Sequence, residues 1–283
     1  MINITVLIVN YKSSEKTLKF INKIPQEYQI IVVDNSSNND LKKKIENLKN
    51  VKFIETTNEG YGSAINKGSA QVLTKFFFAF SPDIQGVDSI FLDKFEKIIK
   101  SGLQFGAIGP RFLNVSEKSH NQSNINKKIC KINAISGAAI LLNKNIFDEV
   151  KGFDEKIFLF FEENDLCFRL IKKNFNIYQL NDAKVFHPKG IDKGVVEAEK
   201  ENQVELKNFY GWHYMWSKFY HFKKNKLKLL AYLYFLPILL RISIRIILYT
   251  IISDIKKKSK YQMRLSGLIT SMLNKTSDKR INL

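Results

Sequence analysis

The chain has 283 residues, of which 45% are hydrophobic and 25% are charged; this excludes wholesale disorder and suits one large domain or one domain with an appendage. The formal net charge of +18 lies mostly at one end, because residues 207–283 hold 16 Lys and Arg against two acids, whereas the first 206 residues carry only +4. The two distant cysteines, Cys130 and Cys167, have no metal-ligand spacing, and the apolar N-terminus has no basic region. We therefore expect a cytoplasmic protein rather than an exported one.

The first part of the chain alternates between apolar runs typical of strands and segments with helical periodicity. Residues 4–9 form a continuous apolar run with one Thr, as expected of a parallel strand that is buried on both faces. Further strands are predicted at 30–33, 51–54, 76–80 and 106–108, and helices at 13–24, 41–48, 61–73 and 91–100. This alternation predicts a Rossmann-like, doubly wound α/β sheet with right-handed crossovers.

Polar residues follow four successive predicted strands: Asn10, Asp34, Asn58 and Asp83. Ligands of such sheets bind beyond the carboxyl ends of the strands, so these residues predict a binding site. Residues 58–62 predict a tight turn that opens a helix and whose N–H groups approach a phosphate or sugar; an ordinary strand-to-helix turn is the alternative. Neither the dinucleotide fingerprint nor a P-loop occurs in the sequence, which argues against dinucleotide oxidoreductases and P-loop NTPases.

An acidic cluster at 162–165 follows an aromatic run at 158–161. Glu162, Glu163 and Asp165 are expected at the edge of a packed core, where burial raises the pKa of a carboxyl group and suits it to act as a general base. A solvated first turn of a helix is the alternative, since acids favour helix N-termini.

Eight segments, in this order, resemble an inverting glycosyltransferase of family two with the GT-A fold, and within that family its bacterial rhamnosyltransferase-like branch. They are VLIVNYK at 6–12, VVDNSS at 32–37, NEGYG at 58–62 with NKG at 66–68, SPD at 81–83, ISGAA at 135–139, GFDE at 152–155, EENDL at 162–166 and VFH at 185–187. Each segment alone is a weak signal, but the ordered set is specific and extends over about residues 3–190.

The resemblance implies roles for particular residues. The donor-binding residues would be Asn10, Tyr11, Asp34, Asn58, Gly60, Asn66 and Asp83, and the acceptor side would be formed by Ser136, Gly137 and Ala138. Asp34 would hold the base or ribose of the donor, and Asp83 with His187 would hold Mg²⁺ or Mn²⁺ on the diphosphate. Taken alone, His187 is more often structural, and small residues at 136–138 also let a strand pack closely.

The catalytic acid departs from the family pattern, because Glu163 stands where the family usually has Asp. A Glu accepts the proton from one methylene further away, and a misplacement of about 1 Å can cost roughly 100-fold in rate. Either the site is adjusted, or Glu162 or Asp165 shares the role. A second departure is Ser81, where relatives often have Asn, but neither change removes an acid, so we expect an active enzyme.

The last part of the chain differs in composition, and we predict a catalytic domain at 1–205 and a basic, apolar helical tail at 206–283. Apolar runs at 229–240 and 246–252 are separated by Arg241 and Arg245, and the first contains Pro237. Each run is shorter than the span of about 20 residues that a bilayer requires, so we expect helices that lie in the membrane interface. A packed extension or a homo-oligomer interface is the alternative, and nucleic-acid binding is not expected. The polar segment 112–131 predicts a mobile loop that closes over donor or acceptor.

The expected function is transfer of a sugar, preferably rhamnose from dTDP-rhamnose and otherwise from a UDP-sugar, to a cell-surface polysaccharide or lipid-linked glycan. The expected location is the cytoplasmic face of the inner or plasma membrane, with peripheral, monotopic attachment. The alternative is a non-catalytic, membrane-attached sugar-nucleotide-binding protein, in which Glu163 marks lost activity.

Overall fold

The computed structural model describes residues 3–36, 39–113, 126–188 and 203–280. The chain forms two compact units, one of Met1–Asp154 with Leu166–Val196 and the other of Glu155–Asp165 with Glu197–Leu283. The division between 1–205 and 206–283 stays a prediction. The units differ from it in two respects: residues 155–165 belong with the C-terminal helices, and the first unit ends at Val196 rather than at residue 205.

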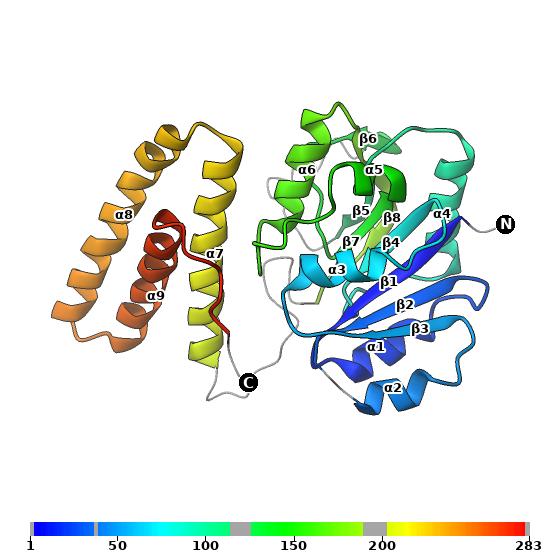
Figure 1. Ribbon diagram of the computed structural model, residues 1–283, viewed down its shortest axis with the longest axis horizontal. Helices are drawn as coiled ribbons and strands as arrows, with labels where there is room; N and C mark the ends of the chain where they lie inside the picture. The colour runs from blue at the N-terminus through cyan, green and yellow to red at the C-terminus, as the bar shows by residue number, and fades with distance from the viewer. Residues whose placement is uncertain (1–2, 37–38, 114–125, 189–202, 281–283) are drawn as a thin grey trace. The chain divides into compact units, whose positions relative to one another are not determined.

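The first unit is built on one mixed sheet (Figure 1). Its strands are β1 (Ile4–Asn10), β2 (Gln29–Asp34), β3 (Val51–Glu55), β4 (Phe76–Phe80), β5 (Ala107–Phe112), β6 (Ile129–Lys131), β7 (Ala139–Asn143) and β8 (Ile177–Val185). Their order in the sheet is β3-β2-β1-β4-β7-β5-β8-β6. Strands β3, β2, β1 and β4 are parallel, β7 is antiparallel to β4 and β5, and β6 is antiparallel to β8. The chain reverses its winding direction at β1, which pairs with both β2 and β4, so the carboxyl ends of these strands meet at one edge.

Helices cover both faces of this sheet, which explains why its central strands are apolar without alternation. Helices α1 (Ser14–Ile21), α2 (Asn39–Ile45) and α4 (Ser89–Lys100) contribute to one hydrophobic cluster, and α3 (Tyr61–Ser69), α5 (Lys144–Glu149) and α6 (Glu162–Lys172) to the other. In Figure 1, α3 lies on one side of β1 and β2, and α1 and α2 lie on the other side. Within β1, Ile4, Val6 and Ile8 face the first cluster, and Leu7 and Val9 face the second.

The predicted doubly wound α/β sheet is confirmed, and its first four strands match their predicted positions closely. The predicted helix at 13–24 is too long, because Lys23 and Ile24 donate to Phe20 and Ile21 at the three-residue spacing of turns, after α1 has ended. The strands β6 and β8 and the antiparallel insertion of β7 were not predicted, since they depend on pairings between distant segments. Residues 114–125 of the predicted mobile loop lie outside the described residues, and its last three residues form β6.

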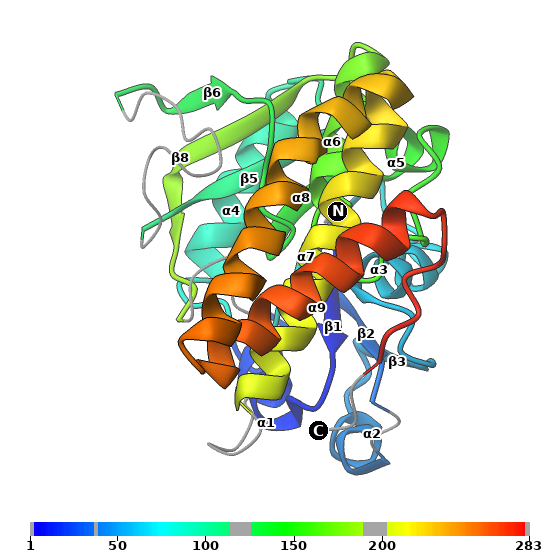
Figure 2. The same ribbon diagram turned by 90° about the vertical axis from the view of Figure 1, so that its left-hand side faces the viewer.

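The second unit contains α7 (Gln203–Asn225), α8 (Lys228–Ile251) and α9 (Ile255–Met272), which lie side by side in both views (Figure 2). Their shared core includes Met215 and Phe219 of α7, Phe235 of α8 and Leu268 of α9. Gly267 permits the close approach of α9 to α7, because a Cβ atom there would lie 2.2 Å from the backbone oxygen of Trp212.

The two apolar runs of the tail form one continuous helix, α8, with Pro237 inside it. Each run alone is too short to span a bilayer, but of the described helices α8 alone is long and apolar enough to cross a membrane, by length and composition. Attachment in the membrane interface stays a prediction. Only 17% of the most apolar 18-residue stretch of α8 is buried. Seven exposed residues at spacings of three or four form a stripe, which we call the α8 stripe: Leu229, Leu233, Leu236, Leu240, Ile244, Ile247 and Ile251.

Candidate functional site

Asn10 and Asp34, at the carboxyl ends of the neighbouring strands β1 and β2, form one buried network. The side-chain amide of Asn10 donates to Asp34 Oδ1 at 2.6 Å, and the hydroxyl of Ser36 donates to the same oxygen at 2.6 Å. The hydroxyls of Ser13 and Thr17, at the start and within α1, donate to Asn10 Oδ1 at 2.9 and 2.8 Å. These bonds fix the Asn10 amide so that its N–H groups point toward Asp34, which is fully buried.

Asp83 and His187 are brought together by an isolated β-bridge between Gln85 and Phe186. The backbone N–H of each bridge residue donates to the carbonyl of the other, at 2.9 and 3.0 Å. Gly86 has a φ of +88°, and a Cβ atom there would lie 2.9 Å from the carbonyl oxygen of Lys184, so this close pairing requires glycine. His187 Nε2 then lies 3.6 Å from Asp83 Oδ1, with both side chains buried.

The Asp83 carboxylate is unusual because neither of its buried oxygens accepts a hydrogen bond from the part of the chain that the structure describes. A buried carboxylate without donors is costly, and such an exception in a native structure calls for an explanation, of which a bound ion is one. The donor set of one carboxylate and one imidazole fits a divalent cation, and imidazole suits Mn²⁺ better than Mg²⁺. No cluster of three or more His, Cys, Asp or Glu that could hold a metal ion occurs among the described residues.

The predicted acceptor residues lie beside the loop that carries Asp83. The backbone N–H of Ser81, at the end of β4, donates to the carbonyl of Ala138 at 2.9 Å. The phenol of Tyr61, at the start of α3, donates to the carbonyl of Gly137 at 2.9 Å. Ser136 is buried, and its hydroxyl accepts from the N–H of Ala138 at 3.3 Å. The structure therefore joins Asp83, the start of α3 and the segment 136–138 at one edge of the sheet.

The other predicted donor residues are positioned differently. Gly60 precedes α3 with a φ of +106°, and its N–H donates to Asn58 Oδ1 at 3.3 Å. Both ends of the Asn66 amide bond the backbone of Phe153, at 3.0 and 2.8 Å, so Asn66 fixes the turn at Gly152. Its role in donor binding stays a prediction, as does that of the half-buried Tyr11.

The acidic segment begins α6 and belongs to the second compact unit. Glu162 is only 6% exposed, and its Oε2 has no hydrogen-bond partner among the described residues. Burial, and then the neighbouring Glu163, raises the pKa of Glu162 well above its ordinary value. Glu163 is half-buried, and its Oε1 accepts from the Asn164 amide at 3.3 Å. The alternative of a solvated helix turn thus fails for Glu162.

Two aromatic residues just before this helix have left-handed backbone conformations. Phe160 has a φ of +66° and Phe161 a φ of +68°. This region costs a bulky residue about 1–3 kcal/mol and tends to occur at functional sites, where the surroundings enforce it.

Asp165 is completely buried and fully engaged. Lys224 Nζ lies 2.8 Å from its Oδ1 and 2.9 Å from its Oδ2, and the Asn225 amide donates to Oδ1 at 3.1 Å. Asn225 also bonds His221 Nδ1 at 3.1 Å, and burial lowers the pKa of His221. Each oxygen of the Asp165 carboxylate is therefore held by at least one side chain of α7.

Lys224, Asn225 and His221 were not predicted as site residues. They lie at the end of α7, about 60 positions from Asp165 in the sequence, and no local pattern marks a lysine in a basic helix as the partner of a particular acid. Only the packing of α7 on the acidic segment identifies them.

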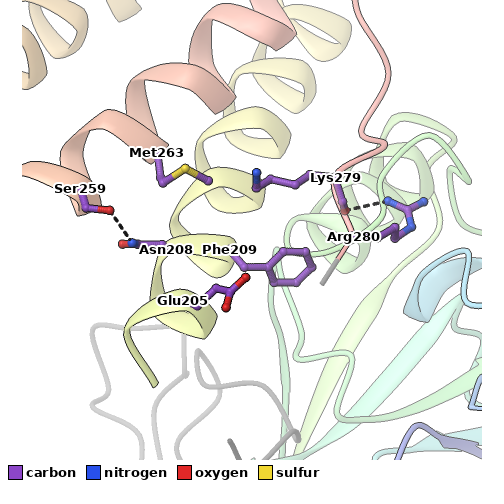
Figure 3. A pocket seen from close by; sticks show the side chains of 7 residues that line it. All are labelled: Glu205, Asn208, Phe209, Ser259, Met263, Lys279 and Arg280. Carbon is purple, nitrogen blue, oxygen red and sulfur yellow. Dashed lines mark hydrogen bonds between the residues drawn. The ribbon is translucent and has the colours of Figure 1, made fainter. Parts of the chain in front are cut away.

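A separate pocket of about 200 Å³ lies in the second unit (Figure 3). Its lining comes from α7, α9 and the C-terminal segment: Glu205, Asn208, Phe209, Ser259, Met263, Lys279 and Arg280. None of these is a predicted site residue; Glu205, Lys279 and Arg280 are exposed, and Phe209 is buried.

The mixed sheet with acidic and amide groups at its parallel strand ends defines a class, the nucleotide-diphospho-sugar transferases of the GT-A fold. The chain belongs to glycosyl transferase family 2, because the family model described as "Glycosyl transferase family 2" matches residues 5–149. It is therefore a glycosyltransferase, and the non-catalytic alternative is set aside.

Two curated relatives extend this result. The chain is 22% identical to the low-salt glycan biosynthesis hexosyltransferase Agl10 of Haloferax volcanii, over 73% of this chain and 74% of that protein. It is 23% identical to the N-acetylglucosaminyl-diphospho-decaprenol L-rhamnosyltransferase of Mycobacterium tuberculosis, over 58% of this chain and 68% of that protein.

Solved structures confirm the fold. The mannosyltransferase PcManGT from Pyrobaculum calidifontis, in complex with GDP-Man and Mn²⁺, aligns with a TM-score of 0.62 at 12% identity, over 96% of this chain and 88% of that one. S. aureus TarS 1–349 with UDP-GlcNAc gives a TM-score of 0.55 at 14% identity, over 97% and 93%. GalNAc-T7 with UDP, GalNAc and Mn²⁺ gives 0.53 at 13% identity over 66% of this chain, which spans 44% of that enzyme's length.

The raised pKa of Glu162 makes stability depend on pH. Between the ordinary and the raised pKa the folded state binds more protons than the unfolded state, so stability falls as pH rises through this window. Glu162→Gln removes the penalty, and a tenfold change in proton affinity corresponds to about 1.4 kcal/mol. We expect a higher Tm than the unaltered protein at pH 8, and a difference that shrinks toward pH 4.5, as measured by calorimetry.

The exposed Glu46 supplies the control, since Glu46→Gln should leave Tm nearly unchanged at both pH values. A Glu162→Gln protein that is less stable at pH 8, or equally shifted at every pH, contradicts the expected burial of a protonated carboxyl group.

Proposed function

We propose that this protein is an inverting, metal-dependent glycosyltransferase that moves a sugar from a nucleoside diphosphate to an acceptor hydroxyl on a lipid-linked glycan. The observation that carries the proposal is the buried Asp83 carboxylate, 3.6 Å from His187 and without hydrogen bonds from the described residues. It lies beyond β4, beside the carboxyl end of β1, where ligands of doubly wound sheets bind.

In this proposal the donor lies along the strand ends. Asp34, held by Asn10 and Ser36, binds the base or ribose, and the turn at Gly60 approaches the phosphates. Asp83 and His187 hold Mn²⁺ or Mg²⁺, which when bound neutralises charge on the departing diphosphate. Glu163 accepts the proton of the acceptor hydroxyl, which attacks the anomeric carbon from the side opposite the diphosphate, so one displacement inverts the configuration.

The preferred donor is dTDP-rhamnose, and UDP-sugars are the competing donors. The M. tuberculosis relatives, named as L-rhamnosyltransferases acting on a diphospho-decaprenol, support both the sugar and a polyprenyl-linked acceptor. The hexosyltransferase relative from H. volcanii supports the wider class of hexose donors.

Asp83→Asn keeps the size of the side chain but removes its charge. The metal would then be held less well, and the charge of the donor diphosphate would stay uncompensated. Metal-dependent donor binding should therefore weaken about 100-fold or more, and turnover should fall with it. Calorimetric titration of dTDP-rhamnose and UDP-sugars, with and without Mn²⁺, measures this directly. Donor binding that is equally strong in EDTA and in the Asp83→Asn protein would exclude a metal at this position.

Glu163→Gln keeps the shape of the side chain but cannot accept a proton at neutral pH. It should lower kcat by roughly 100-fold or more and leave donor affinity near normal. Glu163→Asp, which restores the usual acid of the family, should retain far more activity than Glu163→Gln. The assay is nucleoside diphosphate release with N-acetylglucosaminyl-diphospho-decaprenol as acceptor; wild-type turnover by Glu163→Gln would refute the assignment.

We further propose that the α8 stripe attaches the enzyme peripherally to the cytoplasmic face of the membrane. The stripe is apolar and exposed, and the surrounding residues 207–283 carry an excess of 14 positive charges. Anionic lipids attract such a surface. Arg241 is exposed near the middle of α8, where a spanning helix would bury a costly charge, so attachment in the interface is favoured over a span.

The double variant Leu236→Asn with Ile244→Asn alters two stripe residues that are 52% and 64% exposed, so folding should be unaffected. Binding to vesicles of phosphatidylcholine with phosphatidylglycerol should weaken about tenfold or more in flotation assays. Ile90→Asn, at a 66% exposed position on α4, is the matched control. If neither protein binds vesicles and the variant instead converts an oligomer to a monomer, the stripe is a homo-oligomer interface.

A further inference from the structure

One face of α7 contacts residues 158–165, the segment that carries the proposed base. Residues of α7 at spacings of three or four contact it: Phe209, Tyr210, His213, Tyr214, Ser217, His221, Lys224 and Asn225. Such spacing puts side chains on one face of a helix. The segment and α7 belong to the same compact unit.

The first half of this contact is aromatic. Phe158 packs edge-on against Phe209, with ring centroids 6.2 Å apart, and the Arg280 guanidinium lies 3.8 Å from its ring centroid. Phe160 meets Tyr210 edge-on, at 5.8 Å between centroids, and Phe161 packs against Tyr214 at 5.5 Å. The two left-handed residues, Phe160 and Phe161, are thus the ones whose rings α7 holds.

The second half of the contact is polar. The Ser217 hydroxyl donates to the carbonyl of Leu159 at 2.8 Å, which fixes the backbone just before the left-handed pair. At the other end, Lys224 and Asn225 bond the buried carboxylate of Asp165. The N–H of Asp165 donates to the carbonyl of Phe161 at 2.9 Å and so closes the first turn of α6 around Glu162 and Glu163.

Strained backbone persists only where its surroundings enforce it. Here the enforcing contacts lie on both sides of Glu162 and Glu163, at Leu159, Phe160 and Phe161 before them and at Asp165 after them. The contacts therefore hold the turn that carries the two acids.

We infer that α7 holds residues 158–165 in the conformation that the reaction needs. Asp165, Lys224 and Asn225 are then positioning residues that set the orientation of Glu163. This rests on the proposed role of Glu163 as the base. It gives the C-terminal helices a part in the reaction in addition to membrane attachment, and it makes Asp165 a positioning residue rather than an alternative base.

Lys224→Met tests the inference in the full-length protein. The variant leaves the buried Asp165 charge without its cation, so the turn should open and the amide of Asp165 should lose hydrogen-exchange protection. A misplaced base should lower kcat by about 100-fold, with donor affinity within about twofold. Lys224→Arg keeps the charge and should recover most of the loss, and the exposed Lys207→Met, on the same helix, should behave as the unaltered protein.

The pH profile separates positioning from catalysis. Asp165→Asn should lower the plateau of kcat but keep the limb that rises with pH, because Glu163 still titrates; Glu163→Gln should remove that limb. Loss of the limb in Asp165→Asn would overturn the inference and make Asp165 the base.

Unchanged exchange protection of residues 158–165 in Lys224→Met, or lost protection with wild-type kcat, would also overturn it. An unaltered protein without turnover on dTDP-rhamnose or any UDP-sugar would instead contradict the proposed function, and hydrogen exchange would still decide whether α7 holds the segment.

Discussion

Burying a carboxylate away from water is costly unless donors or cations compensate it, and this constraint organises the protein. Four predicted site residues bury carboxyl groups in the described structure: Asp34, Asp83, Glu162 and Asp165. Asp34 accepts from neighbouring polar side chains, and Asp165 pairs with a lysine. The other two lack full compensation among the described residues: Asp83 has no donor for either oxygen, and Glu162 has none for its Oε2 and a pKa that burial raises. The satisfied acids are part of the scaffold, whereas Asp83 is the acid at which we propose that a cation binds.

The scaffold differs between the two compact units. In the sheet unit, backbone pairing does the positioning: the bridge between Gln85 and Phe186 brings Asp83 to His187, and the pairing of β1 with β2 brings Asn10 to Asp34. In the helical unit, side chains of α7 hold the acidic segment through rings and one ion pair. Backbone hydrogen bonds between strands tolerate many side-chain changes, whereas an arrangement that side-chain contacts hold does not. Substitutions on α7 should therefore affect the acids more strongly than substitutions in the sheet affect the strand ends.

The helical unit has two distinct surfaces. One face of α7 packs on the acidic segment, while α8 presents an apolar stripe to the outside and shares a core with α7 through Phe219 and Phe235. The turn between α7 and α8 is short, since α7 ends at Asn225 and α8 begins at Lys228. The proposed attachment to lipid and the proposed positioning of the acids would thus depend on the same small core.

The sequence by itself determined the alternation of strands and helices in the sheet, because period and apolar runs are local properties. It also determined the strand-end residues, the acidic cluster and the family, because these are ordered short motifs. It did not determine the antiparallel β7, the strands β6 and β8, the continuity of α8 through Pro237, or the partners of Asp165. These depend on contacts between residues far apart in the chain, and a lysine such as Lys224 gives no local sign of which acid it will meet. Only tertiary structure decided which buried carboxylates are satisfied, because that depends on what folding brings within about 3 Å of each oxygen.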